Sequence, residues 1–174
     1  MDSIKEKIRA IPDFPKKGIM FRDVTTLLKD AKGFCDVINQ FSERYKNMDI
    51  KYVAGIESRG FIIGGALAKE LGVGFIPIRK KGKLPAEVIR EEYKLEYGTD
   101  TIEIHKDAIT KGDKILLVDD LLATAGTMKA AINLVEKAGG IVTSTACIVE
   151  LISLKGREKI KDYDFFSLAQ YEGE

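Results

Sequence analysis

The chain has no tryptophan, a single histidine and only two cysteines, and each scarcity argues against a class of function. With one histidine, His105, a Cys/His zinc site is excluded and a Ser-His-Asp or Cys-His catalytic arrangement is disfavoured. Cys35 and Cys147 lie far apart and form no CxxC motif, so the chain has no disulfide framework. Such cysteine usage is typical of a reducing compartment, and we expect a cytoplasmic protein.

Long apolar runs and an excess of one charge sign are also missing. No run reaches the length that spans a bilayer, and residues 1–6 are charged and followed by no apolar signal region. The 28 Lys and Arg against 27 Asp and Glu leave a net charge of +1, which gives no basic field for nucleic acid or anionic lipid. We therefore expect no nucleic acid and no membrane among the partners.

What is present is an alternation of strand and helix patterns. The 174 residues, 45% of them hydrophobic, fit one domain over residues 1–174. Apolar runs predict strands over residues 52–56, 75–78, 115–118, 141–149 and 165–168. Apolar stripes and small residues predict helices over residues 34–45, 60–71 and 126–138. This alternation predicts an α/β fold with a central, mostly parallel twisted sheet and helices on both faces.

Both the N-terminus and the middle of the chain depart from this alternation. A capping box at residues 3–6, followed by isoleucines at helical spacing, predicts a helix that ends at Pro12. Residues 12–23 are then expected to form an ordered loop. Residues 79–105 carry many charges and predict a hairpin that turns at Gly98. A long polar excursion of this kind is typical of a lid or binding loop.

The segment from residue 115 to residue 127 carries the clearest chemical signal. A buried strand leads to two adjacent carboxylates, Asp119 and Asp120, and a loop of small and hydroxylated residues then enters a helix. Backbone N–H groups at a helix start suit a phosphate, and ligands of open α/β sheets bind at the carboxyl ends of strands. The two carboxylates suit sugar hydroxyls or a metal instead. The segment has no Walker or dinucleotide glycine motif, and a simple capping role for the two aspartates stays open.

Residues 118–127 resemble the phosphoribosyl-pyrophosphate (PRPP) signature of the type I phosphoribosyltransferases. Five further segments resemble the adenine-specific branch of that family: residues 21–23, 55–61, 79–85, 95–98 and 153–158. Nearly the whole chain is covered. The resemblance implies the fold of that family and a pentosyltransferase of purine salvage, which converts adenine and PRPP to AMP and diphosphate. It also implies a homodimer and a Mg²⁺ cofactor held mainly by the substrate, with no direct protein ligand.

The resemblance assigns the acidic pair and the loop after it to the ribose 5-phosphate moiety. The loop that would hold the 5′-phosphate consists of Ala123, Thr124, Ala125, Gly126 and Thr127. Asp119 and Asp120 would bind the ribose hydroxyls. Ala125 stands where most members of the family have glycine. If that position needs a positive φ, alanine costs about 1 kcal/mol there.

A second loop is implied for pyrophosphate. It consists of Glu57, Ser58 and Arg59, between a strand and a helix, and the family often has a non-proline cis peptide there, which would be Glu57–Ser58. Arg59 would donate charge-assisted hydrogen bonds to the pyrophosphate. Arg79 and Lys83 would add positive charge from the lid. A surface ion pair for Arg59 and a plain solvated basic run remain alternatives.

The base would lie against Met20, Phe21 and Arg22, with Phe21 packed on the ring face. The resemblance places Glu96 near N7 of the base, and this residue is the catalytic candidate because adenine must lose a proton as N9 attacks C1′. In the hypoxanthine and guanine branch an aspartate of the phosphate loop serves this purpose, but Ala123 stands there in this chain. Tyr97 would close over the ribose. Core packing of Phe21 and an outward-facing Glu96 are the simpler alternatives.

Three other functions remain open at this point. The chain could use another base, against which Ala123 and residues 57–61 argue. It could be a PRPP-sensing regulator of nucleic acid, but residues 1–30 leave no room for a DNA-binding module and the net charge is +1. It could be a degenerate member kept for interactions, against which the intact acidic pair, Arg59 and Glu96 argue.

Overall fold

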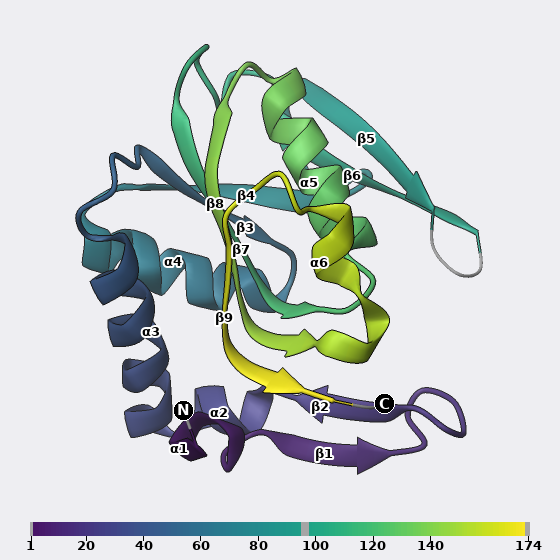
Figure 1. Cartoon of the computed structure of the whole chain (residues 1–174). Helices are drawn as coiled ribbons and strands as arrows, with labels where there is room; N and C mark the ends of the chain where they lie inside the picture. The colour runs from purple at the N-terminus through teal and green to yellow at the C-terminus, as the bar shows by residue number, and fades with distance from the viewer. Residues whose placement is uncertain (1, 95–97, 173–174) are drawn as a thin grey trace.

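In the computed structural model, which describes residues 2–94 and 98–172, a seven-stranded sheet carries helices on both faces (Figure 1). Its strands lie in the order β5-β6-β4-β3-β7-β8-β9. They are β3 (Tyr52–Ile56), β4 (Gly74–Lys80), β5 (Val88–Lys94), β6 (Thr99–His105), β7 (Lys114–Leu122), β8 (Ile141–Leu151) and β9 (Phe165–Tyr171). Strands β4, β3, β7, β8 and β9 pair in parallel, and β6 and β5 extend the sheet antiparallel. The predicted α/β class is confirmed.

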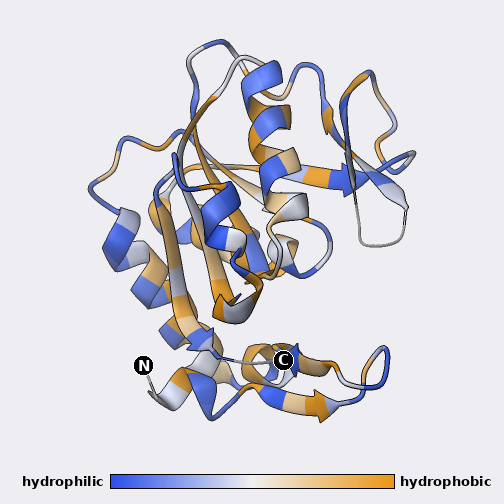
Figure 2. Cartoon of the chain, turned by 45° about the vertical axis from the view of Figure 1, so that its right-hand side comes forward, coloured by the Kyte–Doolittle hydropathy of each residue, from blue (hydrophilic) through white to orange (hydrophobic). Residues whose placement is uncertain are grey.

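The helices lie on the two faces because the central strands are apolar on both sides. Helices α3 (Ala31–Tyr45) and α4 (Arg59–Leu71) pack on one face, and α5 (Gly126–Lys137) packs on the other (Figure 1). Along β7, Leu116 and Val118 belong to the first apolar cluster, while Ile115 and Leu117 belong to the second. Figure 2 shows the resulting hydrophobic strands between helices with mostly hydrophilic outer faces.

Two parallel neighbours, β3 and β7, position the region of interest. The carboxyl end of β3 leads into α4 and that of β7 leads into α5, so both loops lie at the same edge of the sheet. Strand β7 is longer than predicted. It continues through the acidic pair because Leu121 and Leu122 pair with Val149 and Glu150 of β8. Asp119 and Asp120 therefore lie within the last part of the strand.

The N-terminal prediction is wrong in one respect. Helix α1 covers only Asp2–Lys5, and the chain then forms strand β1 (Arg9–Pro12), which pairs antiparallel with β2 (Met20–Asp23). The helical spacing of the isoleucines has a different origin, because Ile4 and Ile8 are buried in the core while Ile11 pairs with Phe21. The expected loop over residues 12–23 thus contains a strand that carries the three residues assigned to the base.

The remaining segments complete the described chain. Helix α2 (Thr25–Lys29) follows β2, and a 3₁₀ turn (Ile152–Leu154) with helix α6 (Gly156–Lys159) links β8 to β9. The predicted hairpin is confirmed as β5 and β6, which pair from Val88 with His105 to Lys94 with Thr99. Glu96 and Tyr97 lie outside the described residues. Within the described ranges, no helix is both long enough and apolar enough to cross a membrane.

Candidate active site

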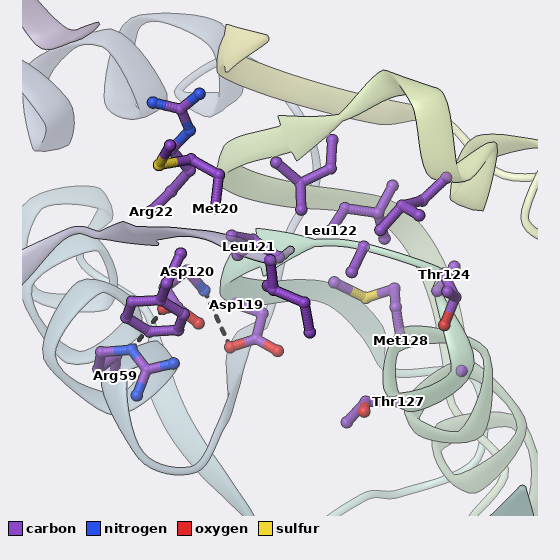
Figure 3. A pocket seen from close by; sticks show the side chains of 17 residues that line it. Met20, Arg22, Arg59, Asp119, Asp120, Leu121, Leu122, Thr124, Thr127 and Met128 are labelled. Carbon is purple, nitrogen blue, oxygen red and sulfur yellow. Dashed lines mark hydrogen bonds and ion pairs between the residues drawn. The ribbon is translucent and has the colours of Figure 1, made fainter. Parts of the chain in front are cut away.

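A cavity of about 500 Å³ opens at the carboxyl edge of the sheet (Figure 3). It brings together three segments that lie far apart in the sequence and that the sequence analysis singled out. The expected residues that line it are Met20, Phe21, Arg22, Arg59, Asp119, Asp120 and the loop from Ala123 to Thr127. Figure 3 shows the acidic pair between Arg59 on one side and Thr124 and Thr127 on the other.

The acidic pair is held by Arg59 and by its own backbone. Nε of Arg59 donates a hydrogen bond to Oδ2 of Asp120, and the backbone N–H of Asp120 donates to Oδ1 of Asp119 at 2.9 Å. The Asp120 side chain is 9% exposed and that of Arg59 is 41% exposed. Burial, together with the adjacent Asp120 charge, raises the pKa of Asp119 well above its ordinary value. Two carboxylates therefore line the cavity, and Asp119 binds its proton more tightly than an ordinary carboxyl group does.

Helix α4 begins directly against this pair because its second residue is glycine. A Cβ on Gly60 would lie 2.9 Å from the carbonyl oxygen of Val118 and 3.2 Å from Oδ1 of Asp119. A side chain at this position would push the helix start away from β7. Gly60 thus allows Arg59 to come within hydrogen-bond distance of Asp120.

The loop between β7 and α5 has the geometry of an anion site. Ala125 is buried and adopts φ 60°, so the left-handed conformation that glycine favours occurs here at an alanine. Helix α5 begins at Gly126 and has no acidic residue in its first turn. Its first N–H groups have no partner within the helix, and the helix dipole places partial positive charge there. Thr124 and Thr127 add hydroxyl groups to the lining.

Strand β2 supplies the apolar and aromatic wall. Phe21 is half-buried, and its ring meets that of Phe14 edge-on at 5.1 Å between centroids. The Arg22 guanidinium lies 4.1 Å from the ring centre of Tyr171 on β9. Nε of Arg22 is buried and has no hydrogen-bond partner among the described residues. The wall therefore combines ring surface with one unused donor.

The other residues assigned to pyrophosphate lie outside the lining of the cavity. The Glu57–Ser58 peptide is cis, as the resemblance implied. Oε2 of Glu57 accepts hydrogen bonds from Nε of Arg79 at 3.0 Å and from the backbone N–H of Lys80 at 3.0 Å. Nη1 of Arg79 donates to the carbonyl oxygen of Lys83 at 3.2 Å. These contacts tie the carboxyl ends of β3 and β4 together beside the cavity.

Several apolar lining residues were not predicted. They are Ile19, Leu121, Leu122, Met128, Leu151 and Leu154. Leu151 and Leu154 come from the end of β8 and the 3₁₀ turn after it. The segment from residue 153 to residue 158 was recognised in the sequence without a role. Its position against the cavity depends on the β8 pairing, which no local pattern reveals.

Known proteins are similar to this chain in both sequence and fold. A model of the phosphoribosyl transferase domain matches residues 24–173. The adenine phosphoribosyltransferase of Pelodictyon phaeoclathratiforme is 59% identical over 175 residues, which cover 98% of this chain and 99% of that protein.

Solved structures agree with the sequence comparison. The crystal structure of adenine phosphoribosyltransferase from Thermoanaerobacter pseudethanolicus superposes with a TM-score of 0.95 at 52% identity, covering 98% of this chain and 99% of that one. The enzyme from Saccharomyces cerevisiae, complexed with D-2,5-dideoxy-2,5-imino-altritol 1,6-bisphosphate and adenine, gives 0.91 at 39% identity, covering 96% and 97%. The chain therefore belongs to the phosphoribosyltransferase family and, within it, to the adenine phosphoribosyltransferases.

Proposed function

We propose that the cavity is the site at which this adenine phosphoribosyltransferase joins adenine to PRPP, yielding AMP and diphosphate. The observation that supports the assignment most strongly is that one cavity holds a helix-start loop, a carboxylate pair and an aromatic wall in succession. These three features match the phosphate, the ribose and the base of one nucleotide. The Saccharomyces cerevisiae enzyme, complexed with an imino-altritol bisphosphate and adenine, supports a site that takes both phosphate and base.

The loop from Ala123 to Thr127 would bind the 5′-phosphate through backbone N–H groups and the two threonine hydroxyls. Asp119 and Asp120 would accept hydrogen bonds from the ribose hydroxyls, and their negative charge also favours the positive charge that develops on the sugar as the bond to pyrophosphate breaks. Arg59 would stabilise the departing pyrophosphate. Its contact with Asp120 keeps the guanidinium at the edge of the ribose position.

Pyrophosphate would extend from Arg59 toward the Glu57 and Ser58 loop. Arg79 and Lys83 would supply further positive charge beside that loop, although the Arg79 guanidinium is bonded to Glu57 here. In the reaction the bond between C1′ and adenine N9 forms while the bond between C1′ and the pyrophosphate oxygen breaks. Positioning of these groups and electrostatics therefore account for the protein's part in the rate.

The base would stack on Phe21, with Met20 and Arg22 beside it. Adenine must give up a proton as N9 becomes bonded to carbon, and Glu96 would accept it, with Tyr97 closing over the ribose. Glu96 fits this role by chemistry, since the phosphate loop has apolar Ala123 where a carboxylate could otherwise stand.

Mg²⁺ is the proposed cofactor, bound with PRPP. In residues 2–94 and 98–172, no group of three or more His, Cys, Asp and Glu is arranged to hold a metal ion. Asp119 and Asp120 are nevertheless hard oxygen donors of the kind that Mg²⁺ prefers, and the ion commonly keeps most of its waters. The residues thus fit an ion held mainly by substrate oxygens, which would neutralise part of the pyrophosphate charge.

We also propose a domain organisation, a location and an oligomeric state for the whole chain. Residues 1–174 would form a single domain, which is supported by the contact of Tyr171 near the C-terminus with Lys5 near the N-terminus. A cytoplasmic location is supported by two cysteines that form no disulfide with each other. Family membership supports a homodimer, and light scattering of the purified protein would test it.

The assignment is tested by measuring nucleotide and diphosphate release from PRPP and Mg²⁺. Adenine, hypoxanthine, guanine, xanthine and uracil would be compared in parallel. Turnover with adenine alone is expected. Turnover with another base would keep the phosphate and ribose assignments and overturn the assignment of β2 to adenine. If the protein did not bind PRPP, the assignment of the whole cavity would be overturned.

A further inference from the structure

Glu150 is a buried carboxylate near the end of β8 that does not line the cavity. Its side chain is 6% exposed and is surrounded by donors. It accepts from Nε and Nη2 of Arg157 at 2.8 and 2.6 Å, from Oγ of Ser167 at 2.9 Å and from Nε2 of Gln170 at 3.0 Å. The paired Arg157 lowers the pKa of Glu150, so the buried carboxylate is ionised at neutral pH. A buried charge with so complete a set of donors fixes the groups around it.

Arg157 belongs to helix α6, and Glu150 and a ring on β9 hold its guanidinium. The guanidinium makes a bidentate contact with Glu150 and lies 4.6 Å from the ring centre of Phe165. The short helix is thereby attached to two adjacent strands of the sheet. Four residues of helix have little stability of their own, so this attachment determines where α6 lies.

The first residue of α6 touches the loop assigned to the 5′-phosphate. A Cβ built on Gly156 would lie 2.1 Å from the carbonyl oxygen of Ala123 and 3.1 Å from the backbone nitrogen of Ala125. The contact is therefore backbone against backbone. Glu150 approaches the same loop by a second route, since it pairs across the sheet with Leu122, the residue before Ala123.

The contact between Gly156 and the phosphate loop is important because the loop backbone adopts an unfavourable conformation. Ala125 has φ 60° without the freedom of glycine. N–H groups that bind a phosphate must also keep their direction to a fraction of an ångström. The packed Gly156 backbone restricts how the loop can relax.

We propose that the Glu150–Arg157 ion pair is a positioning device for the phosphate loop. The pair holds Gly156 against Ala123 and Ala125 and so sets the affinity for the 5′-phosphate of PRPP without touching the substrate. This inference rests on the proposed function, because it takes the loop to be the 5′-phosphate site.

The test compares two ion pairs of similar geometry. Arg157→Ala removes the proposed device. Arg44→Ala is the matched control, because Arg44 contacts both carboxylate oxygens of Asp164 at 3.0 and 3.1 Å and stacks on Phe166 at 4.8 Å. That pair joins α3 to the segment before β9 and has no contact with the phosphate loop.

Arg157→Ala should raise the KM for PRPP about tenfold and weaken ribose 5-phosphate binding by the same factor in calorimetry, with the KM for adenine within about twofold. Arg44→Ala should lower the melting temperature and leave the KM for PRPP unchanged. Arg157→Lys keeps the positive charge but cannot make the bidentate contact with Glu150, and we expect it to raise the KM for PRPP roughly threefold. That variant carries the test if Arg157→Ala does not fold.

An unchanged KM for PRPP in the Arg157 variants, or an equal rise for both substrates, would overturn the inference. So would the same PRPP effect in Arg44→Ala, which would indicate general destabilisation. Thr127→Val separates this failure from that of the proposed function. If Thr127→Val raises the KM for PRPP and Arg157→Ala does not, only the positioning role fails. If neither variant does, the phosphate-loop assignment fails.

Discussion

Nε of Arg59 donates a hydrogen bond to the buried Oδ2 of Asp120, so the cation assigned to pyrophosphate and a carboxylate assigned to ribose meet at the cavity wall. The two residues come from α4 and β7 and are 61 positions apart. Their contact joins the two substrate regions at the place where the bond to be broken would lie. It also means that neither side chain can be changed without affecting the other.

Arg59→Ala should lower kcat/KM for PRPP about 100-fold, because it removes a charged donor from the leaving group. It should also lower the melting temperature, since Asp120 stays buried without its partner. Steady-state kinetics and a thermal melt measure both effects. Lys69→Ala is the control, because Lys69 lies on the same helix with its side chain 86% exposed. A kcat/KM within twofold of the original would contradict the role of Arg59.

Asp119→Asn should separate stability from function. Burial and the Asp120 charge raise the pKa of Asp119, so the folded protein holds this proton more tightly than the unfolded chain. Stability therefore falls as pH rises from the ordinary carboxyl range through the raised pKa.

In Asp119→Asn the side chain cannot ionise, so the loss of stability with rising pH that Asp119 causes does not occur. At pH 7, Asp119→Asn should melt at a higher temperature than the original protein, and below the pH range of an ordinary carboxyl group the two melting temperatures should be nearly equal. The affinity for PRPP should fall, because the charged acceptor for a ribose hydroxyl is lost. Thermal melts across pH and PRPP titrations check both. If Asp119→Asn were less stable than the original protein at pH 7, ionisation of Asp119 would not destabilise the folded protein, contrary to this prediction.

Glu96→Gln should reduce kcat by about 10²–10⁴-fold and leave PRPP binding nearly unchanged, because a general base is lost while the phosphate sites remain. Glu92→Gln is the matched control, because Glu92 is an exposed glutamate on β5, shortly before Glu96 in the sequence. Single-turnover rates and PRPP calorimetry separate the two effects. Full turnover in Glu96→Gln would remove this residue from the chemistry.

Ala125→Gly should leave the free energy of unfolding nearly unchanged. Relief of the left-handed conformation gives about 1–2 kcal/mol, offset by about 0.8 kcal/mol for the buried methyl and about 0.4–1 kcal/mol for the freer unfolded chain. Ala131→Gly, at a fully buried position inside α5, has no strain to relieve and should lose about 2 kcal/mol. Denaturant titrations compare the two, and equal losses would mean that Ala125 carries no conformational cost.

Tyr171→Leu should raise the KM for adenine several-fold, because the ring that holds the Arg22 guanidinium beside the base wall is lost. Tyr171→Phe keeps the ring and should behave like the original protein, apart from the weak 3.4 Å hydrogen bond to the Lys5 carbonyl. Initial rates over a range of adenine concentrations check this. Equal effects of both substitutions would assign the role to the hydroxyl instead.

Local patterns were enough to predict the part of the fold that carries the phosphate loop. Strand β7 and helix α5 were predictable because an apolar run, a small-residue loop and a terminal glycine pair follow one another in the sequence. Helix α4 was equally clear, since Gly72, with φ 70°, ends it. The family motifs then located the acidic pair and Arg59.

What escaped prediction depends on contacts between distant segments. In the sequence, Ile11 continues the helical spacing of Ile4 and Ile8, but in the structure it lies opposite Phe21 in the antiparallel pair of β1 and β2. Leu151 and Leu154 reach the cavity because β8 pairs with β7 beyond the acidic pair. The hydrogen bond between Arg59 and Asp120 likewise depends on Gly60 packing against β7, which one sequence does not reveal.

A crystal structure of the protein with bound AMP tests the central assignment most directly. The account predicts the 5′-phosphate within hydrogen-bond distance of backbone N–H groups of residues 124–127, the ribose hydroxyls on Asp119 and Asp120, and the base on Phe21. A phosphate bound elsewhere, or a base on the opposite side of the acidic pair from β2, would contradict it.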